Sequence, residues 1–156
     1  MQSEFSNHRV PASLNEAGFV YRRSVRASVE GVNTDLSRPL DRRIQVVVML
    51  LDNHSHKQIA LKEMARQVNL SPGRLAHLFK SEMELSIQQY LTRVRLAKAI
   101  RHLESSFLSI KEIAASVGFS SVRRFVVCFK NLVGATPAQY RKHFPHASYQ
   151  RAEILP

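Results

Sequence analysis

The chain has 156 residues, of which 44% are hydrophobic, enough to build one packed domain or two very small ones. It carries 23 Lys and Arg against 12 Asp and Glu, and the net charge of +11 favours an anionic partner, unless it serves only to solubilise the surface. A single cysteine, Cys128, excludes an intramolecular disulfide; together with the absence of a signal-peptide pattern or a membrane-length apolar run, it predicts a cytoplasmic protein without a membrane partner.

Composition divides the chain into three segments. Residues 1–38 show weak apolar periodicity and are expected to form a short N-terminal arm, poorly ordered or locally helical. Residues 39–144 hold 17 basic and 7 acidic residues, so this region carries nearly all of the excess charge. Residues 145–156 are expected to form a frayed C-terminal tail. The middle segment is therefore the candidate for a folded domain that meets an anion.

Within 39–144 the apolar residues recur at helical spacing and no stretch alternates as a strand would, which predicts an all-α fold. Seven helices are expected in chain order, at about 42–54, 61–68, 71–82, 86–105, 109–117, 120–133 and 136–144. In the second and third helices, Leu61 and Leu78 are expected to point inward, and Cys128 of the sixth helix is expected to be buried in the position of Leu78.

Two parts of this region repeat one another. "LKEMARQVNL" at 61–70 matches "IKEIAASVGF" at 110–119, and the pairing at 49 residues extends to Ser71 and Ser120. After one inserted residue it continues at 50 residues, from Arg74 and Arg124 to Lys80 and Lys130. The pattern indicates a duplicated structural unit.

Each unit is predicted to be a helix-turn-helix, the first at about 59–82 and the second at about 109–132. Asn69 and Gly118 occupy the same turn position, and both residue types tolerate the positive φ that a tight turn between crossing helices requires. Ser71 and Ser120 are predicted to cap the second helix of each unit. An ordinary helical hairpin is the alternative for either copy alone. Two copies in a basic region favour helices that read the DNA major groove.

The helix predicted at 86–105 sets the distance between the two units. Twenty residues span ~30 Å at 1.5 Å each, and successive major-groove faces on one side of B-DNA lie ~34 Å apart. A single chain would therefore place two recognition helices one helical turn apart. Binding as a monomer is then plausible, because the duplication replaces a second subunit.

The segment "IKEIAASVGFSSVRRFVVCFKNLVGATPAQYRK" resembles the signature of the AraC/XylS family of bacterial transcription regulators, and the resemblance extends over about 41–144. It implies a seven-helix fold with two helix-turn-helix subdomains joined by a long central helix, and activation of transcription through contact with RNA polymerase. Many members carry a larger sensing domain, so the chain resembles a small stand-alone member, a fragment or a degenerate gene product. Glu84 departs from the family, which usually has Gly there, and this places the turn before the central helix in question.

The faces opposite the buried residues of the two recognition helices are the expected DNA-reading surface. Arg123 is the foremost candidate, since a guanidinium matches guanine O6 and N7, while valines suit thymine methyl groups. Val126 is equally consistent with core packing. The base-reading candidates are Pro72, Gly73, Arg74, Ala76, His77, Val122, Arg123, Arg124 and Val127.

Other basic and capping residues are candidates for phosphate contacts, which position a protein on DNA without reading sequence. They are Ser71, Lys80, Arg93, Ser120, Lys130 and Arg141. No cofactor, metal or enzyme site is expected, and "HSH" at 54–56 is interpreted as a loop.

The alternative function is a helical protein-interaction module, either an anti-activator or a partner of polymerase or another regulator, with weak DNA binding. The small residues Gly73 and Ala76 favour that alternative.

Overall fold

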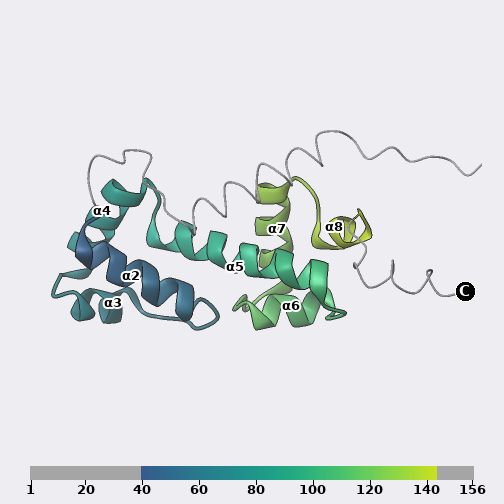
Figure 1. Cartoon of the computed structure of the whole chain (residues 1–156), viewed down its shortest axis with the longest axis horizontal. Coiled ribbons are helices and arrows are strands. Elements are labelled where there is room, and N and C mark those ends of the chain that lie inside the picture. The colour runs from purple at the N-terminus through teal and green to yellow at the C-terminus, as the bar shows by residue number, and fades with distance from the viewer. Residues whose placement is uncertain (1–39, 144–156) are drawn as a thin grey trace, which may run out of the picture.

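The computed structural model describes residues 40–143, and in this range it contains seven α-helices and no strand, which confirms the all-α prediction. Figure 1 shows one long helix, α5, running between a group of three helices at each of its ends. The predicted arm at 1–38 and tail at 145–156 lie outside the described residues. The helices are α2 (Arg42–Asn53), α3 (Leu61–Gln67), α4 (Pro72–Met83), α5 (Ile87–Ser105), α6 (Ile110–Ser116), α7 (Val122–Val133) and α8 (Pro137–His143).

The central helix α5 begins where the sequence supplies a capping box. Ser86 Oγ accepts a hydrogen bond from the Gln89 backbone N–H at 3.2 Å, and Gln89 Oε1 accepts one from the Ser86 N–H at 2.9 Å. The helix runs for 19 residues to Ser105, about 28 Å at the usual rise. Its start and end agree with the predicted 86–105.

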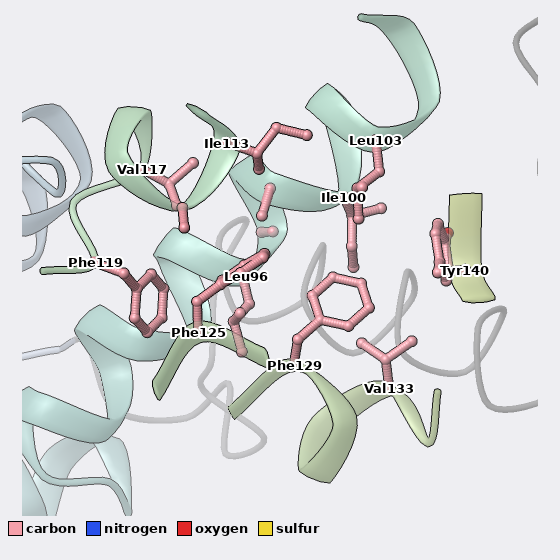
Figure 2. Close-up of a cluster of buried hydrophobic side chains, with 13 residues drawn as sticks. Leu96, Ile100, Leu103, Ile113, Val117, Phe119, Phe125, Phe129, Val133 and Tyr140 are labelled. Atoms are coloured by element: carbon pink, nitrogen blue, oxygen red, sulfur yellow. The ribbon is translucent and has the colours of Figure 1, made fainter. Parts of the chain in front are cut away.

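Two separate hydrophobic cores lie along α5. We call α2–α4 with the start of α5 the N-terminal unit, and the rest of α5 with α6–α8 the C-terminal unit. Figure 2 shows the C-terminal core, where Phe125 and Phe129 of α7 meet α5, α6 and Tyr140. The helix α5 contributes Tyr90, Leu91 and Val94 to the N-terminal core and residues from Leu96 to Leu103 to the other core. One helix therefore contributes to two separate cores.

The two cores repeat the same aromatic contact. In the N-terminal unit the rings of Phe79 and Tyr90 meet edge to face with centroids 5.7 Å apart, and in the C-terminal unit Phe129 and Tyr140 do so at 5.7 Å. Such edge-to-face pairs are favourable beyond the area that they bury. The duplication read from the sequence is thus also present in the packing.

Three burial predictions were wrong. Leu61 is 37% exposed because it is the first residue of the short helix α3 and lies beside solvent. Leu78 and Cys128 are only partly buried, because each flanks the core on the side of its helix rather than facing it.

The turn before α5 forms despite its departure from the family pattern. Glu84 ends α4 in the left-handed conformation at φ 55°, just as Gly134 ends α7 at φ 83°. A non-glycine residue tolerates this conformation at a cost of about 1–2 kcal/mol.

Among the residues described, no helix combines the length and apolar character required to cross a bilayer.

Candidate nucleic-acid interface

The recognition helices α4 and α7 show the same pattern of exposure, residue by residue, at an offset of 50. Each buries a stripe of three residues, Leu75, Phe79 and Met83 in α4 and Phe125, Phe129 and Val133 in α7. The buried stripe fixes which side of each helix faces solvent, because residues three or four apart share one face. Both helices therefore present their outer face with the same orientation relative to their own core.

The base-reading candidates lie on or beside these outer faces. Val122 and Val127 are 39% and 51% exposed. Ala76 and Val126 are partly buried, and Val126 packs against the C-terminal core. The remaining candidates are exposed, namely Pro72, Gly73, Arg74, His77, Arg123 and Arg124.

The caps of the two helices correct the sequence alignment. Ser71 Oγ accepts a hydrogen bond from the Arg74 N–H at 3.3 Å, as predicted. In α7, however, the cap is Ser121, whose Oγ accepts from the Arg124 N–H at 3.3 Å, so the prediction that Ser120 caps this helix was wrong. The inserted residue precedes the cap, and Ser121 is the counterpart of Ser71.

The two turns have the same hydrogen-bond geometry. The N–H groups of Leu70 and Phe119 donate to the carbonyls of Ala65 and Ala114, in both cases at 2.9 Å. Asn69 has φ 53° and Gly118 has φ 94°, as the turn position requires. Both units are therefore helix-turn-helix motifs with matched backbones.

A pocket of about 130 Å³ lies between the two units. Its lining brings together Gln88, Thr92 and Arg95 of α5 with Ser120 and Arg124 beside the start of α7. Burial first, and then the charge of Arg124, lower the pKa of the Arg95 guanidinium. Two guanidinium groups, those of Arg95 and Arg124, therefore line the same pocket.

The other phosphate candidates differ in exposure and in their contacts within the protein. Lys80 and Lys130 are exposed in the last turns of α4 and α7. Arg93 is partly buried on α5. The Arg141 guanidinium donates to the Leu108 carbonyl at 2.6 Å, so in this structure it ties α8 to the segment before α6.

Sequence reasoning missed Arg95, which is only 6% exposed. It lies between Val94 and Leu96, which belong to different cores. The available signal was a charged residue between the part of the long helix that packs in one core and the part that packs in the other.

In the described part of the chain no group of three or more His, Cys, Asp or Glu residues is arranged to hold a metal. The 54–56 segment is a loop, as interpreted.

Comparisons with known proteins match this arrangement. Residues 64–143 match a family model described as a helix-turn-helix domain. The Msm operon regulatory protein of Streptococcus mutans is 33% identical over 99 residues, which cover 64% of this chain and 36% of that protein. The chain thus spans little more than a third of that relative's length.

Two solved structures match over nearly their whole lengths. A Chromobacterium violaceum regulator with an AraC-type DNA-binding domain is 25% identical with a TM-score of 0.62, covering 67% of this chain and 94% of that one. The DNA-binding domain of AdpA, solved with a target DNA, is 27% identical with a TM-score of 0.61, covering 74% and 100%. With its paired helix-turn-helix units and the match to the family model, the chain belongs to the AraC/XylS family of DNA-binding transcription regulators.

Proposed function

We propose that the chain binds double-stranded DNA sequence-specifically, with α4 and α7 in successive major-groove segments on one face of the duplex. The observation that carries the proposal is the pair of recognition helices with matched exposed faces, joined by the 19-residue helix α5. The length of α5, about 28 Å, is close to the ~34 Å that separates groove segments one turn apart. A single chain suffices for this contact, so binding as a monomer is part of the proposal.

Base recognition is proposed to be stronger in the C-terminal unit. Arg123 is exposed on α7 between two exposed valines, Val122 and Val127. This combination suits a guanine next to thymine methyl groups. In α4 the corresponding face carries Pro72, Gly73 and His77, with His77 as its main hydrogen-bonding side chain. The small residues of α4 favour close approach to the DNA more than base discrimination.

Backbone contacts are proposed at three places. Lys80 and Lys130 flank the grooves from the last turns of the two recognition helices. Arg124 and Ser120 line the pocket between the units, and we propose that they contact a phosphate lying between the two groove segments. Such contacts account for affinity and for its salt dependence. The AdpA domain, with its target DNA, supports DNA as the partner.

Transcription activation through a contact with RNA polymerase is the finer part of the proposal, and it rests on the family resemblance. A reporter fused to a promoter that carries the selected DNA site tests it. Expression of the chain should raise transcription from that promoter. Lower transcription would make the protein a repressor instead.

Selection from a pool of random duplexes tests DNA recognition directly. The selected site should bind at least ~10³-fold more tightly than random DNA at physiological salt. A flat distribution of selected sequences would contradict sequence-specific recognition.

The alternative is a protein-interaction module. It is favoured by Val46 and Met49, which are 42% and 63% exposed on the side of α2 away from the N-terminal core. A stable protein partner in a co-purification, combined with no DNA shift at low salt, would support this alternative against the DNA proposal.

A further inference from the structure

A loop of the N-terminal unit is held firmly by α5. Residues 54–57 follow α2, and the Arg95 guanidinium donates to the Ser55 carbonyl at 2.6 Å and to the Lys57 carbonyl at 3.1 Å. Lys98 Nζ donates to the Asp52 carbonyl and to Ser55 Oγ, both at 2.7 Å. Ser55 is fully buried. Three of these bonds satisfy polar groups of the loop, and the fourth satisfies a carbonyl in the last turn of α2.

The same loop meets the turn of the C-terminal unit. A Cβ atom on Gly118 would lie 2.6 Å from the His56 carbonyl oxygen and 2.8 Å from the His56 Cα. Both are backbone atoms, so a side chain would have to displace the loop itself. The Phe119 ring completes the contact, with the Arg95 guanidinium 5.8 Å from its centroid. We call these contacts of Arg95, Gly118 and the 54–57 loop the interlock.

Glycine at position 118 meets two constraints. Asn69 occupies the corresponding position of the N-terminal turn with φ 53° and carries a side chain. Gly118 has φ 94°, which strains an L residue, and it also lies against the His56 backbone. This close approach joins one unit to the other.

We propose that the interlock fixes the angle and separation of α4 and α7, and that Arg95 and Gly118 are positioning residues which set the spacing between the two DNA half-sites. The inference rests on the proposed function, since half-sites exist only if both helices bind DNA. The two units have separate cores, so α5 and the interlock carry their relative orientation. A fixed orientation raises the effective concentration of the second helix at its half-site only when the spacing is right. A loose joint would accept several spacings, each with less gain in affinity.

Two glycines provide a matched pair of variants. Gly118→Ala introduces a side chain against His56, whereas Gly134→Ala introduces one at a similar φ with nothing within 4 Å. Both variants place a side chain on a residue with positive φ, and only the first places it against the interlock. Arg95→Met is the second test, because it keeps an apolar stem and leaves the Ser55 and Lys57 carbonyls without their donors. Circular dichroism and binding to a duplex with only the first half-site establish that each variant is folded.

The decisive measurement uses the duplex selected by the wild-type protein and a series in which its two half-sites are moved by single base pairs. Each base pair also rotates one half-site by about a tenth of a turn. Wild type and Gly134→Ala should lose at least about tenfold in affinity at altered spacings. Gly118→Ala and Arg95→Met should bind the selected duplex less tightly and should lose less than about threefold across the series. A wild-type spacing preference in both interlock variants would overturn the inference.

A second measurement is independent of DNA. Spin labels at Lys62→Cys and Lys111→Cys, in a Cys128→Ala background, report the distance between α3 and α6. Wild type and Gly134→Ala should give one narrow distance distribution, and the two interlock variants a broader or shifted one. Unchanged distributions in those variants would overturn the interlock. A wild-type protein with narrow distances but no preferred duplex would instead contradict the proposed function and leave the interlock standing.

Discussion

Tyr90 donates a hydrogen bond from its phenol to Asp52 Oδ1 at 3.1 Å, which joins α5 to the end of α2. The C-terminal unit repeats this relationship, with Tyr140 donating to Glu104 Oε1 at 2.7 Å. In each unit the tyrosine ring packs in the core while its hydroxyl group reaches a carboxylate at the edge. The duplication therefore preserves a partly buried polar anchor as well as the apolar packing.

The Asp52 anchor makes stability depend on pH. Burial raises the pKa of the Asp52 carboxyl, although the Tyr90 hydrogen bond and the Lys98 charge oppose the shift. The folded protein thus holds this proton more tightly than the unfolded chain, and the stability so gained is lost as pH rises through the folded pKa. Asn at position 52 still accepts the Tyr90 bond and cannot ionise.

We therefore expect Asp52→Asn to gain stability relative to wild type as pH rises from about 3.5 to 7. Urea unfolding of both proteins across this range measures the difference in unfolding free energy. A difference that is constant with pH, or that falls as pH rises, would show that Asp52 is not the group responsible.

Ser121, and not its neighbour Ser120, caps α7, so the two serines should contribute differently to stability. Ser121→Ala should lower the free energy of unfolding by about 1 kcal/mol, because the Arg124 N–H loses its acceptor. Ser120→Ala should change it by less than ~0.5 kcal/mol, as an exposed position outside the helix. Chemical unfolding of the two variants side by side checks the assignment. Equal losses would mean that the cap has been misidentified.

Gly73 occupies the first turn of α4. We predict that this glycine lowers the stability of the helix and lets its backbone approach the DNA closely. A Cβ there would meet nothing within 4 Å, so Gly73→Ala should stabilise the protein by up to ~1 kcal/mol through helix propensity. Its affinity for the selected duplex should fall, because the proposed docking brings the backbone at the start of α4 close to the groove. Unfolding and titration of the same sample measure both effects. An unchanged affinity would place the start of α4 away from the DNA.

Substitution of Arg123 and of Lys130 is predicted to affect DNA binding in different ways. Arg123→Ala should cost ~1–3 kcal/mol of binding free energy and relax the preference at one base pair. Lys130→Ala should weaken binding to all sequences alike and reduce the salt slope by about 1. Repeating the random-duplex selection with each variant distinguishes them. If Lys130→Ala lost the sequence preference and Arg123→Ala kept it, the proposed docking would be contradicted.

The helices were predictable from local signals. Ser86 with Gln89 marks the start of α5, Pro72 marks the start of α4, and the repeat identifies both turns. The register around Ser120 was not predictable, because two adjacent serines are both good caps and only the folded backbone selects Ser121. The exposure of Leu61 depends on where α3 begins relative to the core.

The outer faces of the recognition helices followed from the buried stripes, but the contact between the units did not. It depends on Arg95 reaching a loop 40 residues earlier in the chain. Such a contact leaves no periodic trace in the sequence. The turn position predicts glycine at 118 from its conformation alone, whereas the structure adds a second constraint, the close approach of the His56 backbone.

A hydroxyl-radical footprint on the selected duplex tests most directly whether one chain engages DNA with both recognition helices. We predict two protected windows about one helical turn apart, on the same face of the duplex, with one chain bound per site. One protected window, or two windows that appear only when a second chain binds, would contradict the account.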